Sequence, residues 1–271
     1  MAFDCQEARD PLTGESMTLC LRLLFVVATL TPACGAGATN VGNTGGVPYP
    51  GSATPATSDE MTKTAALHPA LEATFARWAG EGPTGDTAHR ERLQGLATAV
   101  RDRLQTAGSA DVLFVCTHNS RRSHIAQILG LAAARRAGLG DVRTFSGGTE
   151  TTAFNPRAIA ALRRVGVEIG DAGGDNPHHQ VRIGPGVAPV EAFSKRMEDP
   201  PNPASKFVAV MTCTQADATC PYVPGAASRV AVPYEDPKVA DGTPEETARY
   251  DERVAQIGRD LAWVFARVAE K

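Results

Sequence analysis

The run of residues 116–123 holds the side chains best suited to catalysis, and it reads Cys-Thr-His-Asn-Ser-Arg-Arg-Ser. It follows a short apolar segment at 111–115 and precedes a segment rich in Ile, Leu and Ala at 123–137. This order predicts a buried parallel strand, a loop and a helix, and ligands bind at the carboxyl ends of such strands. Successive backbone N–H groups in the loop, with the helix N-terminus behind them, would cradle a tetrahedral anion.

Within this loop, Cys116 is the expected nucleophile, because the same positive field favours its thiolate. Arg122 can hold two oxygens of the anion and stabilise charge in the transition state. The hydroxyls of Ser120 and Ser123 could donate to the thiolate, and Asn119 could brace the loop. The predicted oxyanion-binding residues are Thr117, His118, Asn119, Ser120, Arg121, Arg122 and Ser123. The alternative is a buried structural cysteine followed by a solvated pair of arginines.

Group transfer to a thiolate also needs an acid that protonates or orients the departing oxygen. Asp236 follows a predicted strand at 229–232 and would therefore lie at the same edge of the sheet. Glu235 is the competing candidate, and an ordinary turn residue before proline is the alternative reading of Asp236.

Cys213 and Cys220 follow another predicted strand, at 207–211, which also brings them to the carboxyl edge of the sheet. Three thiols close to one oxyanion site suggest a redox relay by thiol–disulfide exchange. A structural disulfide, or two inert core cysteines, would explain the same pair. We expect no metal site, because Cys-x-x-Cys pairs with spaced histidines are absent from the sequence. The adjacent His178 and His179 in a polar segment are expected to face solvent.

The elements around these residues alternate between strand and helix, with a further strand predicted at 142–146. Asn155 and Pro156 predict a helix start, and Thr243-Pro-Glu-Glu predicts a capped start for the C-terminal helix. Such alternation indicates an α/β fold with three layers around a four-stranded parallel sheet. Residues 170–203 break the pattern with Gly, Pro and paired histidines, and we expect a long loop or small excursion near the site.

Two amphipathic helices are predicted before the sheet, within a lead-in at 61–110. Leu71, Phe75 and Trp78 share one helical face, with a start at His68-Pro69, and a second apolar stripe ends near Gly108. Both helices are expected to pack on the catalytic domain at 111–271, because isolated short helices are only marginally stable in water.

The first sixty residues are expected to lie outside the fold and to be disordered. Residues 23–30 form an apolar run too short to span a bilayer, and Cys34 follows in the layout of a secretory signal or lipoprotein processing site. Two alternatives stay open. Translation from Met17 would give an exported or lipid-anchored protein with a membrane contact only through that anchor, and translation from Met61 would give a cytoplasmic protein.

The composition sets limits on partners. The chain has 271 residues and a formal net charge of −3, which disfavours a nucleic-acid partner. Six cysteines are too few for a disulfide scaffold at this length. An anionic substrate would therefore have to be attracted by local donors rather than by the field of the whole molecule.

The Cys116 loop, Asp236-Pro237 and the strand–helix order resemble the low molecular weight protein tyrosine phosphatase superfamily. The segment 213–220, with its internal Asp-Ala pair and a following Pro221, is similar to the redox helix of thioredoxin-coupled arsenate reductases in that superfamily. The resemblance covers residues 111–271. It implies that Cys116 attacks arsenate, that Cys213 attacks the Cys116 adduct and releases arsenite, and that Cys220 then captures Cys213.

This resemblance also implies a small oxyanion substrate, no bound cofactor, and thioredoxin or a similar thiol reductant as electron donor. Three positions depart from the pattern: His118 replaces a common glycine, Arg121 replaces a cysteine or apolar residue, and Gln127 replaces an acidic residue that helps to bind potassium in some relatives. We therefore expect no potassium ion. Arsenate reductase is the leading hypothesis, a phosphatase acting through a phosphocysteine is second, and a non-catalytic oxyanion or thiol redox sensor is third.

Overall fold

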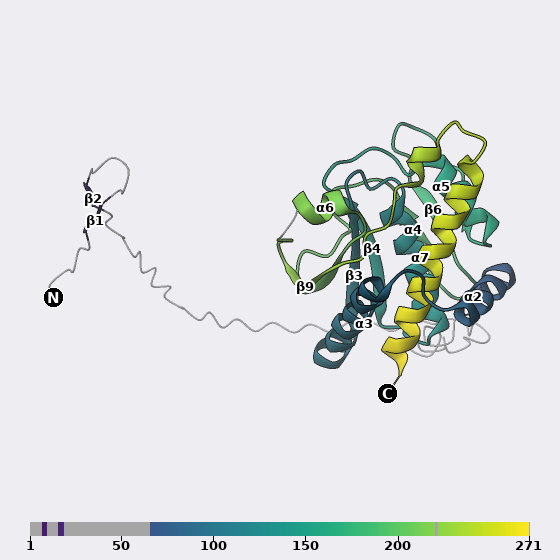
Figure 1. Ribbon diagram of the computed structural model, residues 1–271, viewed down its shortest axis with the longest axis horizontal. Helices are drawn as coiled ribbons and strands as arrows, with labels where there is room; N and C mark the ends of the chain where they lie inside the picture. Colours follow the sequence, from purple (N-terminus) through teal and green to yellow (C-terminus); the bar gives the residue numbers. More distant parts are fainter. Residues whose placement is uncertain (1–6, 10–15, 19–65, 220–221, 271) are drawn as a thin grey trace, which may run out of the picture. The chain divides into compact units, whose positions relative to one another are not determined.

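The computed structural model describes residues 7–9, 16–18, 66–219 and 222–270 (Figure 1). The first two segments are strands β1 (Glu7–Arg9) and β2 (Ser16–Thr18), which pair antiparallel as a unit of their own. We did not expect this pairing. The apolar run at 23–30, Cys34 and Met61 lie outside the described residues, as does Cys220.

A four-stranded parallel sheet forms the centre of the main unit. It consists of β3 (Ala110–Cys116), β4 (Val142–Gly148), β8 (Phe207–Met211) and β9 (Ala226–Ala231), in the order β4-β3-β8-β9. The inner strands β3 and β8 are apolar and almost wholly buried, as expected for strands covered on both faces. The predicted sheet is thus confirmed, although β9 begins three residues earlier than the sequence suggested.

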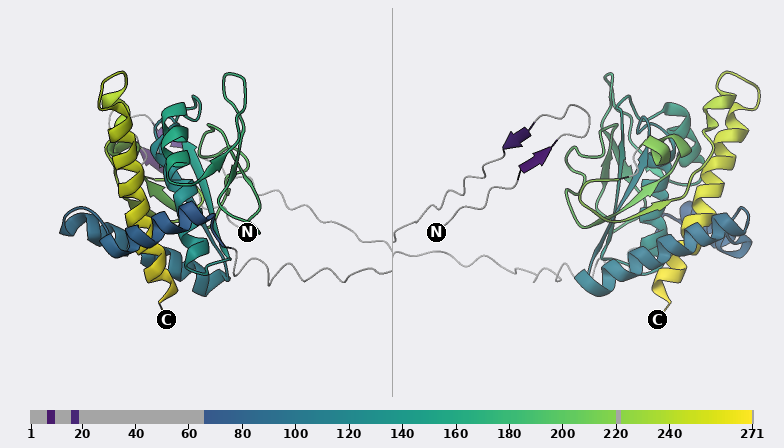
Figure 2. Two further views of the ribbon diagram at one scale, coloured as in Figure 1. Left: turned by 90° about the vertical axis from the view of Figure 1, so that its right-hand side faces the viewer. Right: turned by 60° about the vertical axis from the view of Figure 1, so that its left-hand side comes forward.

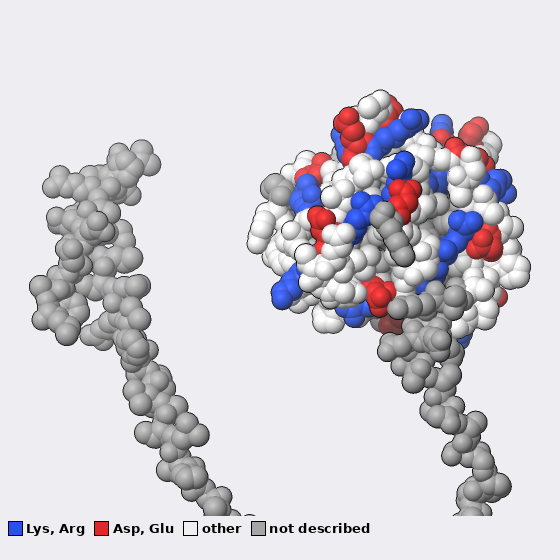
Figure 3. All heavy atoms as spheres, turned by 90° about the horizontal axis from the view of Figure 1, so that it is seen from below, with Lys and Arg blue, Asp and Glu red and all other residues white. Residues whose placement is uncertain are grey.

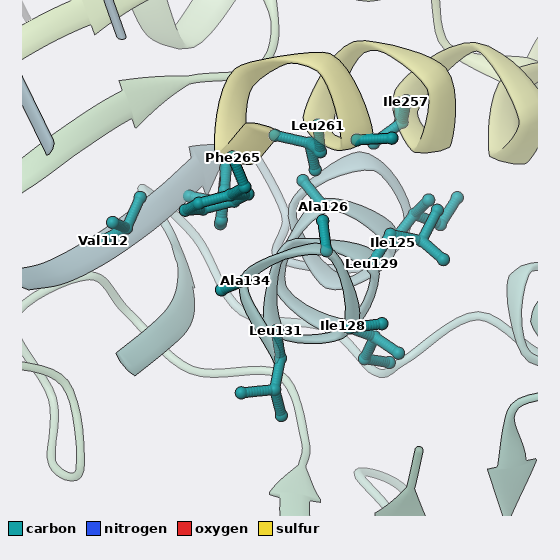
Figure 4. Packing of buried hydrophobic residues seen from close by; sticks show 14 of the residues in the cluster. Val112, Ile125, Ala126, Ile128, Leu129, Leu131, Ala134, Ile257, Leu261 and Phe265 are labelled. Atoms are coloured by element: carbon teal, nitrogen blue, oxygen red, sulfur yellow. The ribbon is translucent and has the colours of Figure 1, made fainter. Parts of the chain in front are cut away.

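Helices cover one face of this sheet in two tiers. Helix α4 (Arg122–Arg136) lies on β3 and β4, and α7 (Glu246–Ala269) packs over α4 (Figure 1). Figure 4 shows Val112 of β3 together with apolar side chains of α4 and with Ile257, Leu261 and Phe265 of α7 in one core. Helix α5 (Pro156–Arg164) also contacts α7, and Asn155 caps its start as predicted.

The other face of the sheet has a smaller core. Leu113, Val115, Ala209 and Met211 point to this side, because side chains alternate along a strand. The short helix α6 (Thr214–Thr219) covers part of this face, and Cys116 and Cys213 belong to the same cluster. The two cysteines are therefore buried together at one end of the sheet.

The lead-in helices pack on the catalytic unit. Helices α2 (Pro69–Glu81) and α3 (Thr87–Ala107) both contact α7, and Figure 2 shows them crossing it. The approach is close at Gly258, where an added Cβ would lie 2.2 Å from the Trp78 ring. Leu71, Phe75 and Trp78 are buried in the main core, so their stripe contacts the fold as the pattern predicted.

A buried carboxylate also connects the lead-in to α7. Asp260 is fully buried and accepts hydrogen bonds from the Thr84 backbone at 2.9 Å and the His89 Nε2 at 2.7 Å. The hydroxyl of Tyr234 bonds the same carboxylate, and burial together with Asp260 raises the pKa of Tyr234 well above its ordinary value. Asp260 thus joins the lead-in to the segment that carries Asp236.

The segment 170–203 is more ordered than the predicted loop. Its strands β6 (His179–Arg182) and β7 (Val190–Ala192) form a second, antiparallel sheet with β5 (Glu168–Ile169), which directly precedes the segment. The expectation that both histidines face solvent was wrong for His179. Its side chain is buried, and Nδ1 lies 2.8 Å from the Gly170 carbonyl oxygen.

The capping pattern at 243–246 also needs correction. Helix α7 begins at Glu246 rather than at Pro244, and Glu245 occupies the N-cap without a side-chain bond. Thr243 and Glu246 still bond backbone N–H groups, those of Glu245 and Gly242 respectively, but they do so in the turn before the helix. A second turn ahead of it is the 3-10 helix η1 (Pro237–Ala240).

None of the helices in the described residues is long and apolar enough to cross a membrane. On the face shown in Figure 3, basic and acidic side chains are interspersed over the main unit instead of forming one patch. This distribution agrees with the small net charge of the chain.

Removing the Asp260 carboxylate should weaken the whole unit. Asp260→Ala leaves His89, Thr84 and Tyr234 without their shared acceptor, and we expect the free energy of unfolding to fall by about 3 kcal/mol. Urea unfolding of the full chain measures this loss. Asp251→Ala is the control on the same helix, because its ion pair with Arg164 is exposed and should contribute less than about 1 kcal/mol. Equal losses in the two variants would contradict this role for Asp260.

A second prediction concerns pH. Burial, aided by the nearby Lys195 ammonium, lowers the pKa of His124 from 6.5 to about 3. Below pH 6.5 this histidine binds a proton in the unfolded chain but stays neutral in the folded chain. Its contribution to the free energy of unfolding is therefore complete above pH 6.5 and is lost as the pH falls toward 3. We expect a loss of about 2 kcal/mol between neutral pH and pH 5 from this group.

Urea unfolding at the two pH values tests this, with His124→Gln expected to flatten the decline because Gln does not titrate. His178→Gln, at a half-exposed histidine, should leave the decline as it is. An unchanged slope in His124→Gln would show that other groups cause the acid sensitivity.

Candidate active site

The candidate site is the loop between β3 and α4, at the carboxyl edge of the parallel sheet. Cys116 is the last residue of β3, the inner strand between β4 and β8, and Arg122 is the first residue of α4. Parallel strands open their ligand sites at this edge, and the helix N-terminus adds unpaired N–H groups there. The sequence predicted this placement.

Ser123 is in direct contact with the Cys116 sulfur. The Sγ atom of Cys116 lies 3.1 Å from Ser123 Oγ, and both side chains are buried. Asn119 Nδ2 donates to the same Ser123 oxygen at 2.9 Å. Because that bond uses Ser123 as the acceptor, the Ser123 proton is free to donate to a thiolate on Cys116.

Asn119 holds the loop in an unusual conformation. Its φ is 43°, in the left-handed region that Asn tolerates better than most residues, and its side chain is fully buried. Its Oδ1 atom accepts the backbone N–H of Lys195 at 2.9 Å. The sequence predicted a bracing role for Asn119, but Lys195 carried no signal because it lies within the segment read as a loop.

The end of β4 supports the loop from the other side. The backbone N–H of Glu150 donates to the Thr117 carbonyl at 2.8 Å. At Gly148 an added Cβ would lie 2.7 Å from that carbonyl oxygen and 2.8 Å from the Asn119 nitrogen. A glycine is therefore required where β4 meets the loop.

Arg122 and Asp236 face each other across the site. An Nη2 of Arg122 donates to Asp236 Oδ2 at 2.7 Å, and Nη1 donates to the Tyr234 carbonyl at 3.1 Å. The Arg122 Nε is buried and has no partner among the described residues, so one donor stays available for an anion. Asp236 also caps η1 by accepting the Lys238 N–H. Glu235 is largely exposed and pairs with Arg253, away from this pocket.

A small pocket lies over the sulfur. It is lined by Cys116, His118, Ser120, Arg121, Arg122 and Asp236. Three of the predicted oxyanion-binding residues do not line it: Thr117 contacts Cys213, Asn119 braces the loop, and Ser123 lies against the Cys116 sulfur. A broader pocket, which shares His118, Ser120 and Arg121, continues beside it toward Asn155.

Arg121 is held differently from Arg122. Its Nε donates to the Tyr250 hydroxyl at 2.8 Å, and its Nη2 lies 3.4 Å from Asp241, which also accepts from Tyr250. Burial raises the pKa of Tyr250 to about 12, with Asp241 as the next cause, so the phenol stays protonated as the donor to Asp241. No sequence pattern pointed to a functional role for Tyr250 or Asp241.

The second cysteine lies close to the loop. Cys213 is buried, its Sγ lies 3.6 Å from Thr117 Oγ1, and it accepts the Ala216 N–H at 3.3 Å. Thr117 directly follows Cys116, so the topology brings both thiols to one end of the sheet. Cys116 and Cys213 are both free thiols. Over the described residues, no group of three or more His, Cys, Asp or Glu side chains could hold a metal ion.

The family model for low molecular weight phosphotyrosine protein phosphatases matches residues 111–173. An arsenate reductase from Shouchella clausii is 31% identical over 161 residues, which is 59% of this chain and 96% of that protein. The chain belongs to the family of this arsenate reductase, within the low molecular weight phosphatase superfamily. An arsenate reductase from Oceanobacillus iheyensis is 30% identical, with 59% and 96% of the two chains covered.

A solved low molecular weight phosphotyrosine phosphatase from Vibrio cholerae is 15% identical, covers 56% of this chain and 92% of its own, and has a TM-score of 0.38. The family-model match includes the Cys116 loop, and together with the arsenate reductase relatives it confirms the predicted superfamily of enzymes. The lead-in helices α2 and α3 precede the family match.

The two arginines should respond differently to substitution. Inorganic phosphate, as a tetrahedral anion, should protect Cys116 from iodoacetamide, and Arg122→Lys should raise the phosphate concentration required by about tenfold, because lysine lacks the bidentate fork. Arg121→Lys should cause a smaller change, since the Arg121 side chain is held by Tyr250 and Asp241. The alkylation rate of Cys116, followed by mass spectrometry, measures both. A larger effect from Arg121→Lys would reverse the assignment of the clamp.

Proposed function

We propose that this chain is an arsenate reductase that works through a relay of three cysteines, Cys116, Cys213 and Cys220. The observation that carries the proposal is the position of Cys213, whose sulfur lies beside the residue that follows Cys116. A phosphatase of this family needs only the Cys116 loop and an acid. The relatives named arsenate reductases, at about 30% identity, support the same choice.

In the first step the Cys116 thiolate displaces one oxygen from arsenate and forms an S–As bond. The loop N–H groups and Arg122 bind the remaining oxygens, and Ser123 stabilises the thiolate before attack. Asp236 lines the pocket and accepts a hydrogen bond from the Arg122 guanidinium. It would protonate the departing oxygen, which leaves as water. Glu235 is largely exposed, pairs with Arg253 and does not line the pocket, so we do not assign it this role.

In the second step Cys213 attacks the Cys116 sulfur. An S–S bond forms, the S–As bond breaks, and its electron pair stays on arsenic, which leaves as arsenite. Cys220 then attacks Cys213, and Cys116 departs as the thiolate. Two thiols have supplied two electrons, and the Cys213–Cys220 disulfide is left for a dithiol protein such as thioredoxin to reduce.

This sequence requires movement of Cys213. The thiol is buried and bonded to the first turn of α6, whose six residues separate it from Cys220. A helix this short is marginal on its own. We therefore expect α6 to unwind during the relay while the Cys116 loop keeps its structure.

The relay predicts a sharp difference between two cysteine variants of the full chain. Cys220→Ser should release about one arsenite per molecule and stop with a Cys116–Cys213 disulfide, because the resolving thiol is gone. Cys213→Ser should release none. Arsenite is measured after a single addition of arsenate, and the disulfide is mapped by mass spectrometry. Cys34→Ser is the control and should turn over continuously with thioredoxin, thioredoxin reductase and NADPH.

Other outcomes separate the competing functions. Hydrolysis of an aryl phosphate that survives Cys213→Ser, without arsenate-dependent consumption of NADPH, would identify a phosphatase instead. Inactivity in both assays by a folded protein would favour a sensor of oxyanions or thiol redox state.

A further inference from the structure

A separate cavity, of about 350 Å³, lies at the β4 edge of the sheet and shares no lining residue with the pocket over Cys116. Helix α4, the edge strand β4 and residues 186–191 form its walls. Its size is within the range of pockets that hold small organic ligands. Residues 170–203, which we call the insertion, therefore enclose a space together with α4 and β4.

Most of the cavity wall is apolar. Leu131 of α4, Phe145 of β4 and Val187, Ala188 and Pro189 of the insertion contribute to it. A ligand that gains from burial here must therefore present an apolar body of several carbon atoms.

Lys195 brings a buried cation to the same cavity. It is 3% exposed, its Nζ donates to the Phe193 carbonyl at 3.3 Å, and it lies 4.6 Å from the centre of the Phe193 ring. Within the described residues no carboxylate lies at ion-pair distance from this ammonium. Burial lowers the pKa of Lys195 to about 8, against the raising effects of Glu191 and Asp199, so the charged form still predominates at neutral pH.

The carboxylates near this wall do not pair with Lys195. Asp111 neutralises Arg143 through two short bonds, whereas Arg135 donates only to backbone carbonyls. Glu191 is the one acidic residue of the lining, while Asp199 and Asp141, outside the lining, act on Lys195 and Arg135 through space.

We propose that this cavity is a binding site for a monocarboxylate with an apolar body. The carboxylate would pair with the Lys195 ammonium, which has one hydrogen-bond acceptor from the described chain for three N–H donors, and the apolar body would lie between α4 and the insertion. A single carboxylate matches one ammonium that has no ion pair among the described residues. A buried ion that is left unpaired is costly, so the cation favours this class of ligand over a neutral one.

The test compares two probes that have the same number of carbon atoms but differ in charge. Isothermal titration of the full chain should show saturable binding of octanoate, about tenfold tighter than that of octan-1-ol. Lys195→Met keeps the aliphatic stem and removes the charge, and it should abolish the advantage of the carboxylate. Lys206→Met is the matched control, because it removes the same charge from an exposed position outside the cavity.

A second variant does not depend on Lys195. Ala188→Trp places a large ring at the exposed mouth of the cavity and should remove binding of both probes. Equal affinity for the two probes, or octanoate binding that Lys195→Met leaves unchanged, would overturn the proposal. So would the lack of saturable binding, or displacement of octanoate by inorganic phosphate, which would locate it in the pocket over Cys116.

Discussion

The active loop depends on the two hydrogen bonds of one buried amide. Asn119 donates to Ser123 and accepts from Lys195, and it does so from a left-handed backbone conformation. The first bond orients the hydroxyl that contacts the Cys116 sulfur. The second ties the loop to the insertion. A side chain without both a donor and an acceptor could not make these two bonds from this position.

A second set of contacts fixes the opposite wall of the pocket. Arg122 reaches the Tyr234 carbonyl and the Asp236 carboxylate, so the clamp and the candidate acid hold each other in place. Tyr234 in turn bonds Asp260, which accepts from His89 of α3. The lead-in helices therefore contribute to the site although they lie before the family match. Their packing on α7 accounts for a part of the chain that the resemblance did not explain.

The sequence predicted the sheet and the loop well because both follow from local patterns. Apolar runs mark inner strands, and Cys116 with Arg122 needs only the turn between a strand and a helix. The insertion could not be read in the same way. Its strands β6 and β7 are four and three residues long, too short to show a clear alternating pattern. His179 lies in β6 and Lys195 follows β7, and nothing in their immediate neighbours signals that both are buried.

Position at the sheet edge was also easier to predict than burial. Cys213 and Asp236 both follow parallel strands, and both lie at the expected edge. Asp236 reaches the pocket directly, whereas Cys213 lies beneath the loop, against Thr117. This difference bears on the proposed relay. Both thiols are buried, but Cys116 lines the pocket and Cys213 does not. In the relay that we propose, the anion would therefore meet Cys116 first, and Cys213 would attack only after α6 opens.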